Sequence, residues 1–298
     1  MRTFGLLIIW AALALPASPA PQGGTGQPPS ADELRARTKT LLAAQHRDDE
    51  ALELYDRIER HIDRTGGPNP RTIENKTYRV VPTGVGNHKL LLHDEGKPAD
   101  AAAYGRQLRA LEDTLQIMAD PDDPRAKTAY AKYQKRMHER AQFVDAAADA
   151  YIPRWAGREN RDGRDCDVFE LNPNPQFQPR SMFQDAFTHI TAKLWIDRAS
   201  QQIVHGEARV TSDIPFGGGI LGKLYRGSLV SMDQAEIAPG IWLPVRYQYD
   251  YAGRKFLFTF DQHEVIEVSH YRRIGPPKEA LQVVQNELST GKAFVEDP

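Results

Sequence analysis

The stretch AKLWIDRASQQIVHGEARV, residues 192–210, holds two apolar-rich runs on either side of the polar segment DRAS, residues 197–200. Two alternating runs around a short turn are typical of a β-hairpin. No catalytic motif accompanies this hairpin. The pattern therefore predicts a structural feature, antiparallel strands joined by short turns, and no activity.

The hairpin belongs to a series of strand-like runs in the second half of the chain. Short segments rich in Val, Ile, Phe, Tyr and Trp alternate there with turn signals. They predict strands at residues 153–158, 165–171, 189–196, 202–211, 220–232, 241–251, 255–261 and 265–273. Short connections between consecutive strands favour an antiparallel meander.

The first half of the chain mixes helices and strands. Ser30 and Glu33 fit a capping box before a helix from residue 31 to about residue 46. Residues 52–64 carry apolar side chains four apart, a spacing that suits either a helix or one strand face, so the pattern leaves both open. The further predicted elements are strands at 72–81 and 88–93, helices within 99–151 with a break at 121–124, and a C-terminal helix and tail at 276–298. In the first of these helices Tyr104, Leu108, Leu111 and Leu115 form one stripe, for which packing is the commoner role.

The N-terminus has the layout of a secretory signal peptide. Arg2 precedes an apolar run from Phe4 to Leu15, and small residues follow up to Ala20. The run is shorter than the about 20 residues that span a bilayer, although an uncleaved anchor is the alternative. We expect residues 1–20 to be removed, residues 21–30 to form a flexible linker, and the protein to be periplasmic or secreted.

The composition is that of an ordinary globular protein. The 298 residues are 40% hydrophobic and 26% charged, with a formal net charge of −2. This balance gives no basic face for a nucleic acid, so no nucleic-acid partner is expected. The single cysteine, Cys166, excludes an internal disulfide and an N-terminal lipid anchor.

Apolar and aromatic rows occur on neighbouring predicted strands. Alternate residues of a strand share a face, so residues 241–251 and 256–260 form continuous rows that must meet a core, a helix or a ligand. A packed core is the commoner case. The residues that this pattern predicts as ligand-lining are Leu194, Ile196, Val204, Tyr247, Tyr249, Phe256, Phe258 and Phe260.

Several motifs approach a chemical signature without completing it. GGGILGKL, residues 217–224, departs from the phosphate-binding loop at Leu224, where a hydroxyl belongs. HEVIE, from His263 to Glu267, lacks the second histidine of a zinc protease. G-x-S-x-G is absent, and Cys166 has no neighbouring base, which favours a buried small residue. The sequence thus predicts no catalytic residue, no metal site and no cofactor.

The order of these strand motifs resembles the periplasmic lipoprotein-carrier superfamily of LolA and LolB. The resemblance covers about residues 52–274. The motifs that carry it are LWID (194–197), IVHGEARV (203–210), WLPVRYQY (242–249), EVIEVSHYRRI (264–274) and the turn DEGKPA (94–99). It implies an α+β fold in which a strongly curved antiparallel sheet, an incomplete barrel, wraps around helices. It also implies a strand at 52–64, one domain over 31–275 and a helical insertion at about 99–151.

The same resemblance implies a function. The concave face of the sheet would hold an apolar ligand, a lipid or the acyl chains of a lipoprotein, so the expected protein is a carrier and not an enzyme. A second interpretation is an envelope sensor or interaction protein that uses this fold without lipid transport, with an envelope protein as its partner. A third, an exported enzyme, would need clustered polar residues in the cavity.

Overall fold

The computed structural model describes residues 30–67 and 69–291. The predicted signal peptide, residues 1–20, and all but the last residue of the predicted linker lie outside this range. The chain divides into two compact units. Unit 1 holds the described residues up to Arg47 together with Asp63–Thr72 and Glu139–Val265, and unit 2 holds Asp48–Ile62, Ile73–His138 and the described residues from Ile266 onward.

Five elements have residues in both units, although β2 (Thr72–Pro82) has only Thr72 in unit 1. The other four contribute longer stretches to each unit. They are the helices α2 (Ala31–Leu52) and α4 (Pro124–Ala150) and the strands β1 (Tyr55–Thr65) and β13 (Phe258–Arg273). The strand β1 settles the choice that the spacing of apolar residues left open and confirms the strand implied by the family resemblance. The helix α2 begins where predicted and continues six residues past His46 to Leu52.

Unit 2 combines the first strands with two helices. Its remaining elements are β2 (Thr72–Pro82), β3 (Asn87–Asp94), β4 (Lys97–Pro98), α3 (Ala101–Ala119) and α6 (Pro277–Thr290). The hydrogen-bonded order is β4-β3-β2-β1-β13, and β2 and β3 pair antiparallel. Asp100 begins α3, since its carboxylate accepts a hydrogen bond from the amide of Ala103.

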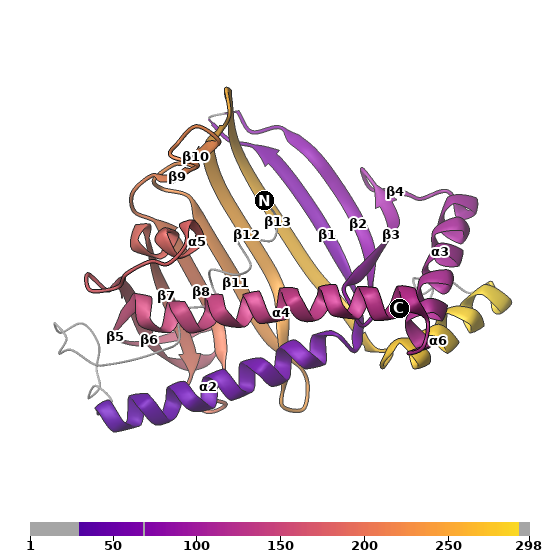
Figure 1. The fold of residues 1–298 in the computed structure, drawn as a ribbon, viewed down its shortest axis with the longest axis horizontal. Coiled ribbons are helices and arrows are strands. Elements are labelled where there is room, and N and C mark those ends of the chain that lie inside the picture. Colours follow the sequence, from indigo (N-terminus) through magenta and orange to yellow (C-terminus); the bar gives the residue numbers. More distant parts are fainter. Residues whose placement is uncertain (1–29, 68, 292–298) are drawn as a thin grey trace. The chain divides into compact units, whose positions relative to one another are not determined.

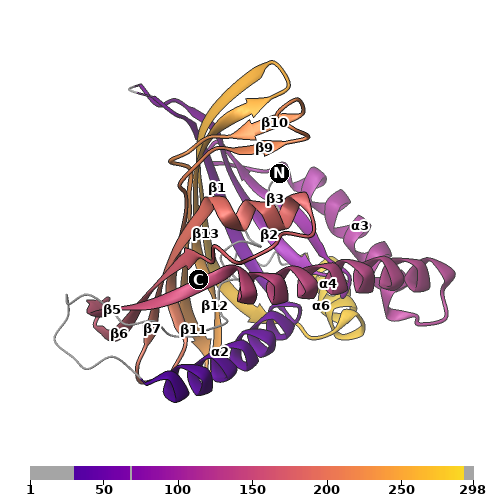
Figure 2. The same cartoon turned by 60° about the vertical axis from the view of Figure 1, so that its left-hand side comes forward.

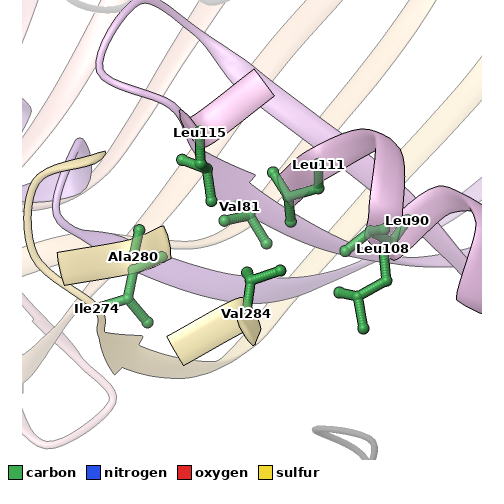
Figure 3. Packing of buried hydrophobic residues seen from close by; sticks show 8 residues of the cluster. All are labelled: Val81, Leu90, Leu108, Leu111, Leu115, Ile274, Ala280 and Val284. Atoms are coloured by element: carbon green, nitrogen blue, oxygen red, sulfur yellow. The ribbon is translucent and has the colours of Figure 1, made fainter. Parts of the chain in front are cut away.

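The core of unit 2 is a cluster of aliphatic side chains. Figure 3 shows side chains of α3 and α6 converging on those of β2 and β3. The cluster comprises Val81, Leu90, Leu108, Leu111, Leu115, Ile274, Ala280 and Val284. Leu108, Leu111 and Leu115 recur at helical spacing, so the stripe predicted within residues 99–151 is confirmed as core.

Unit 1 contains the longer run of strands. Its remaining elements are β5 (Tyr151–Arg161), β6 (Arg164–Pro173), α5 (Met182–Asp185), the 3₁₀-helix η1 (Ala186–His189), β7 (Ile190–Asp197), β8 (Ile203–Val210), β9 (Ile214–Phe216), β10 (Gly222–Leu224), β11 (Leu229–Ala238) and β12 (Ile241–Lys255). The order is β13-β12-β11-β8-β7-β6-β5, and β10 pairs with both β9 and β12. The opening hairpin is β7 and β8, paired antiparallel.

The strand order runs as one path from β4 to β5, so the sheet is not closed into a barrel (Figure 1). Among the neighbouring strands of this path, β2 and β3, β5 and β6, β6 and β7, and β11 and β12 pair antiparallel. With the helices, this confirms the predicted α+β class. None of the helices in the described part of the chain is long and apolar enough to cross a membrane.

Two local predictions were wrong, and one segment was missed. The predicted strand 220–232 is two strands, β10 and β11, because Gly227 adopts a φ of 95° and Ser228 closes a turn onto the carbonyl of Tyr225. The predicted strands 255–261 and 265–273 are one strand, β13. His263 does not interrupt it, since His263 Nδ1 lies 2.6 Å from Oδ1 of Asp250 on the neighbouring strand β12. The short helices over residues 182–189 were not predicted.

Candidate functional site

Two turns of unit 1 lie side by side at one end of its strands (Figures 1 and 2). One joins β9 to β10 and the other joins β12 to β13. Their backbones are bound together, since Gly222 pairs with Lys255 in register and the amide of Phe256 donates to the carbonyl of Leu221 at 3.1 Å. The Arg254 guanidinium adds a hydrogen bond to the carbonyl of Gly219 at 2.9 Å. The two turns therefore form one structural element.

Glycines make this close approach possible. Gly217, Gly218 and Gly219 all have positive φ, which side chains disfavour. At Gly253 a Cβ would lie 2.4 Å from the carbonyl oxygen of Lys223 and 2.6 Å from the Phe260 ring. The glycine run that approached a phosphate loop in sequence is thus a tight turn between two strands.

Large apolar side chains are exposed on these turns. Of seven large hydrophobic side chains that are exposed in the described part of the chain, five belong to this element. They are Ile220, Leu221, Phe256, Leu257 and Phe258, and we call them the apolar tip. Leu257 and Phe258 are 87% and 80% exposed. Exposed apolar residues gathered in this way mark interaction sites more often than scattered ones do.

A hollow of about 650 Å³ lies between the two turns. It is lined by Pro215, Gly218, Gly219, Ile220, Lys223, Arg254, Phe256 and Leu257. Three tip side chains thus meet around one space, with two cationic side chains beside them. This arrangement suits an apolar ligand that carries an anionic group.

Phe256 combines exposure with an unfavourable backbone. Its φ is 53° in the left-handed region, where a residue with a large side chain costs about 1–2 kcal/mol. Its side chain is half exposed, so burial does not offset this cost in full. Asn or Gly would fit the turn better. An aromatic residue kept in such a position points to a role outside stability.

The tip carries positive charge. Residues 214–224 and 252–260 include Lys223, Arg254 and Lys255 and no acidic residue. Two carboxylates flank these segments in sequence: Asp261, and Asp213, whose oxygen lies 3.4 Å from the Lys223 ammonium. The backbone amide of Arg226 and the side chain of Lys223 lower the pKa of Asp213.

The structure separates the eight residues that were predicted as ligand-lining. Leu194, Ile196, Val204, Tyr247 and Tyr249 are all buried. Val204 packs with Trp195 and Trp242 on β7 and β12, and the rings of Tyr247 and Tyr249 stack at 6.3 Å. Phe256 and Phe258 lie in the apolar tip, and Phe260 is partly buried with its ring edge-on to Tyr251 at 5.8 Å.

The residues considered for chemistry lie apart. Cys166 is fully buried, and burial with the nearby Asp197 and Asp165 raises the pKa of its thiol. The Ser228 hydroxyl donates to the Tyr225 carbonyl at 2.9 Å. In the described residues no three side chains of His, Cys, Asp or Glu gather as a metal site would require.

Sequence reasoning missed a polar cluster in unit 2. Glu59 accepts hydrogen bonds from Arg57 at 2.9 Å and Lys89 at 2.8 Å, and His61 lies 2.9 Å away. Burial opposes ionisation of Glu59, but the bond with His61 and the two cations outweigh it and lower the pKa. Arg57, Glu59 and His61 alternate along β1, and this period of two was the available signal.

Comparison with known proteins gave matches to solved structures alone. No family model and no curated protein matches the chain. An outer membrane lipoprotein-sorting protein domain from Vibrio parahaemolyticus is 8% identical, with 83% of this chain and 99% of that chain covered and a TM-score of 0.33. A LolA superfamily protein from Nitrosomonas europaea is 12% identical, with 80% and 96% covered and a TM-score of 0.29.

A DUF1329 family protein from Desulfovibrio piger is 14% identical, with 78% of this chain and 90% of that chain covered and a TM-score of 0.29. At these identities and TM-scores the matches assign neither a family nor a ligand nor a partner to this chain.

Proposed function

We propose that the protein is an exported carrier of an apolar ligand, a lipid or the acyl chains of a lipoprotein, and that the ligand contacts the hollow of the apolar tip. One observation carries this proposal. The hollow of about 650 Å³ is lined by Ile220, Phe256 and Leu257, which remain more than half exposed although each is a large apolar side chain.

Burial of acyl methylenes would provide the binding energy. Each buried methylene contributes about 0.8 kcal/mol, so ten of them contribute about 8 kcal/mol before the costs of ordering the ligand. Lys223 and Arg254 line the same hollow and would pair with a carboxylate or phosphate on the ligand. An anionic amphiphile is therefore the ligand class that fits best.

Three of the pattern-predicted residues belong to this part of the chain: Phe256, Phe258 and Phe260. The five buried ones would contact a ligand only if it displaced the core side chains around them. The proposed role needs no catalytic group. The expected export rests on the N-terminal sequence.

The test is a titration with cis-parinaric acid, a fluorescent fatty acid, kept monomeric. Phe256→Asn removes the aromatic ring and suits the positive φ, so the turn should persist. Ile73→Asn is the matched control, because Ile73 is 51% exposed in unit 2 and Phe256 is 53% exposed. We expect Phe256→Asn to weaken binding about tenfold or more and Ile73→Asn to leave it unchanged.

The result that contradicts the proposal is equal binding by the wild type and Phe256→Asn, or no binding by either. In the second case the interpretation as an envelope sensor or interaction protein would gain support. Circular dichroism of both variants shows whether a loss of binding reflects a loss of fold.

A further inference from the structure

We infer that the apolar tip docks onto an anionic lipid bilayer, with its five apolar side chains entering the interface and Lys255, Arg254 and Lys223 meeting the phosphate groups. This inference does not depend on the proposed ligand. A protein that carries nothing would dock in the same way.

The geometry supplies a unit that can be inserted. The two turns project from one end of the strands and are held together by the backbone pairing of β10 with β12. The Phe256 amide and the Arg254 guanidinium bind one turn to the other. Because Leu257 and Phe258 are at least 80% exposed, they can enter a bilayer without displacement of any core residue.

The charge of the tip favours an anionic bilayer over a second copy of the chain as its binding partner. An anionic membrane presents phosphate groups over an apolar layer, and this order matches cationic side chains beside apolar ones. Residues 213–224 and 252–261 hold three cations and two acids, Asp213 and Asp261, so the net charge of this element is +1 and a second copy would bring like charges together. Asp213 pairs with Lys223, so Arg254 and Lys255 are the cations most available to phosphate groups.

The experiment places a probe on the tip of the full chain. Leu257→Cys can be labelled selectively with an environment-sensitive NBD dye, because the natural Cys166 is fully buried. Ile73→Cys carries the same dye as the control site. The vesicles are phosphatidylcholine alone or with about 30 mol% phosphatidylglycerol, with salt raised to roughly 0.5 M in one arm to screen charge.

We expect the dye at position 257 to shift to the blue and gain intensity on anionic vesicles, less so on neutral vesicles or at high salt. The dye at position 73 should not change. Lys255→Glu in the same background should weaken vesicle binding about tenfold. It should weaken cis-parinaric acid binding much less than vesicle binding, because Lys255 does not line the hollow. All variants keep the N-terminal apolar segment, so any vesicle binding through that segment is the same in each of them. Differences in dye response or vesicle binding between variants therefore come from the tip.

Three results would overturn the inference. The first is no change at position 257 on any vesicle. The second is an equal change at positions 257 and 73. The third is a change at position 257 that rises with protein concentration without vesicles, which would mean that a second copy covers the tip. Absence of fatty-acid binding by the wild type, with vesicle docking intact, would refute the proposed ligand site and leave the docking surface standing.

Discussion

Unit 2 buries charged side chains, whereas the tip of unit 1 exposes apolar ones. Arg79 has 0% of its surface exposed, and Leu257 has 87% exposed. Both depart from the usual partition of residues between interior and surface. The two cases differ in their partners. The buried charge is paired with carboxylates, whereas no part of the described structure packs over the exposed apolar side chains.

The buried network in unit 2 is well satisfied. The Arg79 guanidinium donates to Glu287 at 2.7 Å and to Asp56 at 3.0 Å, and it also donates to the Tyr104 hydroxyl at 3.3 Å. Arg272 donates to the same oxygen of Asp56 at 2.8 Å. A network of this kind holds β1, β2, β13 and α6 in one arrangement. The paired charges make this network a structural feature, and the lack of such partners at the tip is the ground for proposing it as a contact surface.

The largest expected effect on stability comes from removing the cation of the buried network in unit 2. Arg79→Ala leaves Asp56 and Glu287 buried without their shared cation, which should lower the free energy of unfolding by about 3–5 kcal/mol. Urea denaturation measures it. Arg125→Ala is the control, since Arg125 pairs with Asp123 on the surface and its removal should lower the free energy of unfolding far less. Equal losses in the two variants would contradict the account.

The next effect concerns the close packing beneath the tip. Gly253→Ala places a Cβ against the Lys223 carbonyl and the Phe260 ring, both under 3.0 Å away. Overpacking of this size should cost about 1–3 kcal/mol. Thermal unfolding checks the loss. Gly67→Ala, where a Cβ meets nothing within 4 Å at a φ of 87°, separates overpacking from backbone strain.

A smaller effect depends on pH. The pKa of Glu59 is lower in the folded chain than the ordinary value of about 4.3, so its contribution to stability is present above that value and is lost as the pH falls below it. Glu59→Gln should therefore flatten the fall in unfolding free energy between about pH 5 and pH 2. Parallel curves for wild type and Glu59→Gln would refute this assignment.

The smallest expected effect on stability comes from changing an exposed side chain of the apolar tip. Leu257→Asp should change the free energy of unfolding by no more than about 0.5 kcal/mol, because Leu257 is almost fully exposed. Urea denaturation beside the wild type measures it. A loss of about 2 kcal/mol would show that Leu257 is covered in solution, and the comparison with Arg79 would fail.

The sequence predicted the regular elements better than the site. Leu108, Leu111 and Leu115 were identified as a packed stripe because a helix repeats every 3.6 residues. Phe256 and Phe258 were placed on one strand face by alternation, but β12 ends at Lys255 and β13 begins at Phe258, so Phe256 lies in a turn where alternation does not hold. The pairing of Leu221 with Phe256 depends on strand register, which no local pattern contains.

The most direct test of the central claim, that a lipid ligand binds at the exposed apolar tip, is native mass spectrometry. Wild-type protein and Leu257→Asp would be isolated from the envelope fraction of the producing cells without detergent. The account predicts an additional mass of one lipid or acylated peptide on the wild type and its loss from the variant. A bare wild-type mass, or the same adduct on both proteins, would contradict it.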